Sequence, residues 1–126
     1  MVHFLLKDYN KLSDLPDMAK EGLFRALQNV TMPYDLSDEF YERQDRVLRE
    51  MLSRKHITDV SRFDDGITLF KGDITLLKAD AIVNAGNSKM LGCFVPGHHC
   101  IDNAIHSFPG LQLRRDMMQG MAALGE

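Results

Sequence analysis

Apolar residues recur at helical spacing in the first part of the chain, among many charged residues. Within the segment 17–30, Leu23, Leu27 and Val30 share one face, which is the pattern of an amphipathic helix. Pro16 stands just before this segment, and the first turn of a helix tolerates proline. We therefore predict a helix over residues 17–30.

A second amphipathic segment follows a predicted turn at 31–35. Ser37 can cap a helix there, and the acids Asp38 and Glu39 favour the positive end of the helix dipole. Its apolar stripe consists of Phe40, Tyr41, Val47, Leu48, Met51 and Leu52. The charged residues between these positions are interpreted as a solvated face. The two segments predict a helical region, residues 1–62, that needs another element to pack on.

The pattern of apolar residues changes from helical spacing to short apolar runs after residue 62. Segments 67–70 and 81–85 are short and rich in β-branched or other apolar residues, which is typical of strands. Between them, Gly72 permits a tight turn and Asp73 can cap the residues that follow. We predict two strands joined by this turn.

Helical spacing returns from Ile101 onward and is interrupted by proline and glycine at 109–110. The apolar positions are Ala104, Ile105, Phe108, Leu111, Leu113, Met117, Met118, Met121 and Leu124. The order strand, loop, strand, loop, helix predicts an α/β layer, in which ligands bind at the carboxyl ends of the strands.

The composition of the chain narrows the classes of protein to which it can belong. The chain has 126 residues, of which 44% are hydrophobic and 26% charged, as in one globular domain. Its formal charge of −3 argues against nucleic acid as a partner. No apolar run approaches the roughly 18 residues of a membrane span, and no export signal precedes the helices. We expect no membrane partner and a cytoplasmic location.

Two cysteines and two histidines lie close together between the second predicted strand and the next helix. Cys93, His98, His99 and Cys100 flank a proline and a glycine that can bend the loop. Thiolate and imidazole are ligands for zinc, and three protein ligands would leave one coordination position for water or substrate. Adjacent residues of a loop can face either way, so the spacing alone leaves His98 and His99 as alternatives. A disulfide is the less favoured reading, because the chain shows no export signal.

Three segments in order, 72–75, 80–88 and 101–106, resemble a macrodomain, the fold that binds ADP-ribose. Hydrolytic macrodomains usually carry a glycine-rich loop before the aspartate of the third segment, and residues 91–100 replace that loop here. This replacement is similar to the zinc-dependent macrodomains, which remove ADP-ribose from proteins and carry a helical N-terminal extension. The resemblance implies an α/β fold: a partial macrodomain-like sheet with flanking helices over residues 63–126, preceded by an α-helical extension over residues 1–62.

The resemblance also implies roles for individual residues in ADP-ribose binding. Asp73 would accept a hydrogen bond from the adenine amino group, and Ile74 would pack against the adenine ring. Asn87 would hydrogen-bond the distal ribose. The alternative roles are capping of a turn for Asp73, a core position for Ile74 and a turn position for Asn87.

The implied metal is Zn²⁺, held by Cys93, His98 and Cys100. Asp102 falls where the hydrolytic relatives carry a catalytic aspartate, and helix capping is its competing role. The hypothesis is that zinc positions water or the ribose while Asp102 and Asn87 complete the catalytic group.

The resemblance stops early, because a complete macrodomain has further strands and a second glycine-rich loop that nothing after Gln112 supplies. We therefore expect a truncated macrodomain whose unpaired sheet edges favour an oligomer. Its partners would be ADP-ribose or an ADP-ribosylated protein. The alternatives to a hydrolase are a module that binds ADP-ribose without cleaving it and an inactive fragment.

Overall fold

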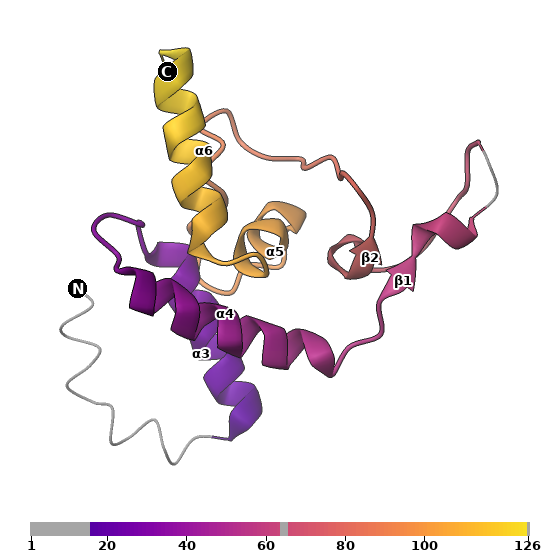
Figure 1. Cartoon of the computed structure of the whole chain (residues 1–126), viewed down its shortest axis with the longest axis horizontal. Coiled ribbons are helices and arrows are strands. Elements are labelled where there is room, and N and C mark those ends of the chain that lie inside the picture. Colours follow the sequence, from indigo (N-terminus) through magenta and orange to yellow (C-terminus); the bar gives the residue numbers. More distant parts are fainter. Residues whose placement is uncertain (1–15, 64–65, 126) are drawn as a thin grey trace.

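Proline and serine mark the starts of the first two helices of the described chain. The computed structural model describes residues 16–63 and 66–125 (Figure 1). Helix α3 (Asp17–Val30) begins after Pro16, as predicted. Helix α4 (Asp38–Ser53) begins after Ser37, whose hydroxyl accepts a hydrogen bond from the Phe40 N–H at 3.2 Å. The part of the predicted helical region at residues 1–15 lies outside the described residues.

Two further helices follow near the end of the chain. Helix α5 (Ile101–Ser107) and helix α6 (Leu111–Leu124) lie side by side, joined by the predicted break. Gly110 makes this connection with φ +85, a conformation that side chains disfavour. The next N–H, that of Leu111, donates to Gln44 Oε1 of α4 at 3.0 Å. This bond attaches the start of α6 to the N-terminal helices.

The sheet is small. Strands β1 (Thr58–Asp59) and β2 (Leu77–Lys78) pair in parallel, and Lys78 Nζ lies 3.0 Å from Asp59 Oδ2. Short 3₁₀ helices adjoin them, η1 (Val60–Arg62) after β1 and η2 (Ile74–Leu76) before β2. In Figure 1 the two strands lie at one end of the molecule, and the chain after β2 runs back toward α6.

The prediction of strands at 67–70 and 81–85 is wrong, because neither segment is a strand in the structure. The side chains of Ile67 and Leu69 are fully exposed, and that of Val83 is 90% exposed. A strand makes its backbone hydrogen bonds to a neighbouring strand, and the described chain places none beside these segments. The coarser prediction of a chain that combines helices and sheet is confirmed. The sheet that the structure describes is a small parallel one.

The interior where the helices meet is largely polar. Its buried apolar residues are Tyr41, Ile105 and Leu111. Its buried polar residues are Gln28, Asn29, Gln44, Asp102, Asn103, His106, Ser107 and Arg114. Arg114 of α6 lies at the centre, where Nη1 donates to the backbone oxygens of Gln28, Asn29 and Thr31 at 2.6–3.2 Å. Its Nε donates to the Leu91 oxygen at 2.8 Å. Arg114 thereby connects the end of α3 with the segment that leads into the Cys/His loop.

Among the helices of the described residues, none has the length and apolar character that crossing a membrane requires.

Candidate metal centre and carboxylate network

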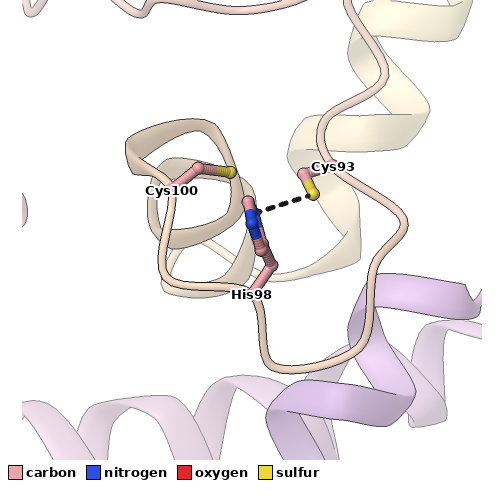
Figure 2. Close-up of side chains that lie close together, drawn as sticks. All are labelled: Cys93, His98 and Cys100. Carbon is pink, nitrogen blue, oxygen red and sulfur yellow. Dashed lines mark hydrogen bonds between the residues drawn. The ribbon is translucent and has the colours of Figure 1, made fainter.

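The loop over residues 91–100, here called the metal loop, brings three potential metal ligands together. The ligand atoms of Cys93, His98 and Cys100 all lie within 4.8 Å of one another. Cys93 Sγ is 3.7 Å from His98 Nδ1, and Figure 2 shows the imidazole between the two sulfurs. Sulfur and nitrogen ligands of one tetrahedral zinc ion lie about 3.6 Å apart. The three donors therefore fit a metal ion, and both cysteines are free thiols.

Glycine at two positions allows the metal loop to fold back on itself. Gly92 has φ +83 and Gly97 has φ +65, both in the left-handed region. The His98 N–H donates to the Val95 oxygen at 3.1 Å, which closes a turn over the proline and Gly97. This turn returns the chain toward Cys93, so that His98 reaches a residue five positions earlier.

The structure chooses between the two histidines that the sequence left open. His98 contributes its Nδ1 to the cluster, whereas His99 is not part of it. The choice follows from the turn, because it fixes which of two adjacent side chains faces the sulfurs.

Cys100 has a second role at the start of α5. Its Sγ accepts a hydrogen bond from the Asn103 N–H at 3.4 Å and caps the helix. This contact orients the sulfur from the helix side, as outer hydrogen bonds commonly orient metal ligands.

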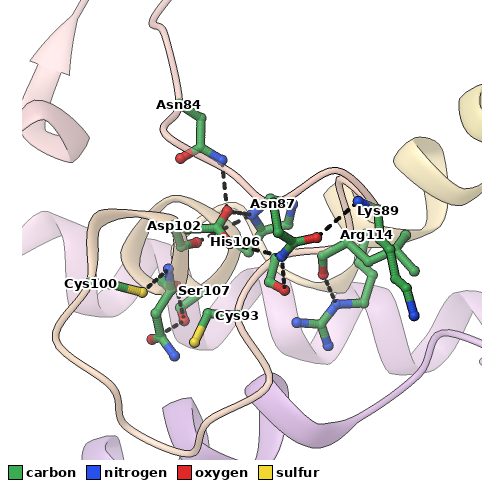
Figure 3. A network of polar contacts seen from close by, with 12 residues as sticks. Asn84, Asn87, Lys89, Cys93, Cys100, Asp102, His106, Ser107 and Arg114 are labelled. Atoms are coloured by element: carbon green, nitrogen blue, oxygen red, sulfur yellow. Dashed lines mark hydrogen bonds and ion pairs between the residues drawn. The ribbon is translucent and has the colours of Figure 1, made fainter.

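Asp102 lies two positions further on and is buried, with 6% of its surface exposed. Asn84 Nδ2 donates to its Oδ1 at 2.8 Å, and Asn87 Nδ2 lies 3.5 Å from its Oδ2. His106 Nδ1 is 3.1 Å from Oδ1 (Figure 3). These contacts replace the water that the carboxylate loses on burial. Asn87 Nδ2 also lies 3.1 Å from the Gly92 oxygen, so the network reaches the metal loop.

Packing around His106 holds the loop and the network together. A Cβ on Gly92 would lie 2.5 Å from His106 Cγ, so the loop backbone passes directly over the ring. His106 Nε2 and Asn84 Oδ1 are buried without a hydrogen-bond partner among the described residues. His106 is therefore a packed residue of α5 that also contacts the Asp102 carboxylate.

Charge in this region is balanced across helices. Burial lowers the pKa of Arg114 below its ordinary value, and electrostatic interaction with the nearby Asp102 and Cys93 side chains counteracts part of that effect. The Arg114 guanidinium also lies over the Phe94 ring, 4.4 Å from its centroid. Arg114 therefore contacts the metal loop at two points, the Leu91 oxygen and the Phe94 ring.

An open cleft of about 1070 Å³ adjoins the network, and its wall includes Ile74, Asn84, Asn87 and His106. Asp73 is exposed outside this wall, where Oδ1 caps η2 by accepting from the Thr75 N–H at 2.9 Å and hydroxyl at 2.6 Å. The structure thus brings Ile74 and Asn87 to one cleft. The metal loop is not part of the cleft wall and connects to it through Asn87.

Several residues that contact the metal loop were not found from the sequence. They are Arg25, Asn29, Asn103 and Arg114. Their partners lie up to 73 positions away along the chain, and no local pattern marks such pairs. The contact between the Asn84 amide and the Asp102 carboxylate, eighteen positions apart, is likewise visible only in the structure.

Comparison with known proteins finds relatives that are named protein-ADP-ribose hydrolases. A Staphylococcus aureus (strain COL) protein named protein-ADP-ribose hydrolase is 47% identical over 98 residues, covering 75% of this chain and 36% of the relative. A protein of the same name from Treponema medium is 41% identical over 126 residues, covering 90% of this chain and 48% of the relative.

A more distant relative comes from Fusarium oxysporum f. sp. cubense. It is named probable bifunctional ADP-ribose hydrolase/ADP-ribosyltransferase and is 38% identical over 91% of this chain, which covers 22% of it. No family model matches the chain. The chain is therefore a homologue of protein-ADP-ribose hydrolases over most of its length, and it spans less than half the length of these relatives.

Proposed function

We propose that this chain is the ADP-ribose-binding and metal-binding part of a zinc macrodomain that hydrolyses ADP-ribosyl groups from modified proteins. One observation carries the proposal: a Cys-His-Cys cluster lies beside a buried carboxylate network in a homologue of protein-ADP-ribose hydrolases. The resemblance of three ordered segments, 72–75, 80–88 and 101–106, to a macrodomain supports the same proposal.

Zinc is the metal that best suits the donors. Two sulfurs and one imidazole, from Cys93, Cys100 and His98, match a borderline-soft ion, and three protein ligands suit a site open to water or substrate. When bound, zinc would supply Lewis-acid chemistry and lower the pKa of coordinated water.

We assign ADP-ribose binding to Ile74 and Asn87 of the cleft wall and to Asp73 just outside it. Asn87 is exposed at its edge and can exchange hydrogen bonds with ribose hydroxyls, since an amide both donates and accepts. Ile74 offers an apolar wall for the adenine ring. Asp73 has an exposed carboxylate whose Oδ1 binds Thr75, which leaves Oδ2 for the adenine amino group.

Asp102 supplies the general base of the proposed reaction. Asn84 and Asn87 hold its two oxygens in place, so a proton transferred to the carboxylate arrives at a fixed atom. Because Asn87 also contacts the Gly92 oxygen, substrate binding, the base and the metal loop share one hydrogen-bonded framework.

One observation favours a second function. Asp102 is buried, and its oxygens already face three side chains of its own chain, an arrangement that suits a structural carboxylate. A module that binds ADP-ribose without cleaving it would need no more than the cleft. We rank it second, because the relatives are named hydrolases.

Metal analysis tests the centre directly. The purified chain should contain equimolar zinc, and H98A should lose it while H99A, which changes the adjacent exposed residue, retains it. Equal zinc in these two variants would contradict the assignment of His98.

Release of ADP-ribose separates the two functions. The chain is incubated with an ADP-ribosylated carrier protein, and free ADP-ribose is measured alongside calorimetric binding of ADP-ribose. A hydrolase releases ADP-ribose, and D102N should slow release by at least about a hundredfold while retaining binding. Binding without release identifies the non-catalytic module.

We make a separate proposal about the oligomeric state of this chain. Both strands of the β1–β2 pair have an open edge within the described residues, and we propose that a second copy pairs there. Sedimentation of the purified chain tests this, since a monomer at all concentrations would exclude it.

A further inference from the structure

Helix α3 supplies two side chains to the metal loop. Arg25 Nη2 donates to the His98 backbone oxygen at 3.1 Å. Asn29 Oδ1 accepts from the Gly97 N–H at 2.9 Å. These contacts hold two consecutive residues of the loop against a helix more than sixty residues earlier in the chain.

The same guanidinium reaches the other side of the loop. Nε and Nη2 of Arg25 both donate to Asn103 Oδ1, at 3.0 and 2.8 Å. Asn103 is completely buried, its Nδ2 donates to the Val95 oxygen at 3.0 Å, and its N–H donates to Cys100 Sγ. Arg25 therefore connects the backbone of His98 with the residue that orients Cys100.

The position of Arg25 is itself restricted. Its guanidinium carbon lies 5.6 Å from the centroid of the Phe108 ring, just after α5. The side chain is half-buried, and its contacts with the loop, with Asn103 and with this ring leave it little rotational freedom.

We propose that Arg25 is a positioning residue of the metal centre, which holds His98 and Cys100 at the spacing a metal ion requires before the ion binds. A loop with Gly97 at its bend samples many conformations when it is free, and ordering it would weaken metal binding. Arg25 removes part of that cost by ordering the loop in the folded chain. The inference rests on the proposed metal function of Cys93, His98 and Cys100.

It also assigns a role to the N-terminal helices. Helix α3 is then part of the metal centre, because it supplies hydrogen bonds that shape the loop. Removal of partners that orient metal ligands commonly costs ten- to hundredfold in metal affinity.

Metal titration of matched variants tests the proposal. Co²⁺ is titrated into the reduced chain, followed by the thiolate-to-metal absorption, and Zn²⁺ affinity is then measured by displacement of Co²⁺. R25A should bind both ions about tenfold more weakly than the unmodified chain. R25K should be intermediate, because an ammonium group cannot serve the two acceptors with the geometry of a guanidinium.

The control is R54A. Arg54 Nη2 contacts Glu21 Oε1 of α3 at 2.5 Å, one helical turn before Arg25, so this variant also removes an arginine contact to α3 but removes no hydrogen bond to the metal loop. R54A should bind metal like the unmodified chain. Thermal unfolding of the metal-free proteins is measured in parallel, and R25K replaces R25A in the comparison if R25A does not fold.

The outcomes are distinguishable. Unchanged affinity in R25A and R25K overturns the role of Arg25 and leaves the metal site standing. Equal weakening in R25A and R54A also overturns it, because general loss of α3 packing would then explain the result. Absence of metal binding in the unmodified chain overturns both the metal site and this inference.

Discussion

The four helices α3 to α6 with the metal loop form one region of the molecule, and the segment 66–90 forms another. The two regions differ in where their polar and apolar side chains lie. In the first region, polar side chains such as Asn29, Asn103 and Arg114 are buried and bind groups from other helices, from helix ends or from the metal loop. In the second, apolar side chains such as Ile67 and Leu69 are exposed. Contacts between its own side chains and backbone hold the first region together. In the second region, these apolar side chains are not covered by any other described part of the chain.

The difference reflects how helices and strands depend on the rest of the chain. A helix makes its backbone bonds within itself, so an amphipathic sequence can form it before its partners are known. An extended segment such as 67–70 needs another strand for every backbone bond. The candidate site lies where the regions meet, because Asn84 and Asn87 come from the exposed segment and Asp102 from the packed one.

Replacement of Arg114 should have the largest effect on the packed region. R114M leaves the backbone oxygens of Leu91, Gln28 and Thr31 without their donor, and we expect a loss of about 3 kcal/mol in the free energy of unfolding. Urea denaturation followed by circular dichroism measures it. R115M changes the next residue of α6, which pairs with Asp116 at the surface, and should alter stability by no more than about 0.5 kcal/mol. Similar losses in both variants would contradict a buried polar centre.

Two glycines of the metal loop provide a smaller and matched test. G92A forces a left-handed residue and places its Cβ against the His106 ring, so we expect a loss of about 2 kcal/mol. G97A carries only the backbone strain, because nothing lies within 4 Å of its Cβ, and should lose about 1 kcal/mol. The same denaturation experiment compares them. Equal losses would show that the loop does not pack on His106.

The β1–β2 link should weaken in acid. The hydrogen bonds from Ser61 and Lys78 lower the pKa of Asp59 from 3.8 to about 2. A lowered pKa in the folded state means that the contribution of the carboxylate is complete above about pH 4 and is lost as the pH falls toward 2. Carbon NMR of the Asp59 carboxyl group measures its titration directly. D59N should remove this pH dependence, and a midpoint near 4 would contradict the contacts.

Substitutions in the exposed segment should have the smallest effect. The double variant I67T/L69T should change the free energy of unfolding of this chain by less than about 0.5 kcal/mol, since both side chains are already in water. Denaturation of the double variant, with the unmodified chain alongside, provides the measurement. A loss above about 1 kcal/mol would show that these residues are buried in solution, for example against a second copy.

The helices of this protein were determined largely by local sequence. The predicted segment 17–30, the cap at Ser37 and the break at 109–110 all coincide with the structure. Asp73 also caps the turn expected of it. These features depend on residues within a few positions of one another. The strands at 67–70 and 81–85 were predicted wrongly, because strand propensity does not supply the neighbour on which a strand depends.

The candidate site likewise combines features that local sequence predicts with features that depend on tertiary packing. The short spacing of Cys93, His98, His99 and Cys100 was sufficient to predict metal ligands, because a bent loop can close over so few residues. Only the tertiary structure decided that His98 faces the sulfurs and that Arg25, on a distant helix, holds the loop in place. Such contacts follow from how helices pack, and packing joins residues whose separation along the chain carries no signal.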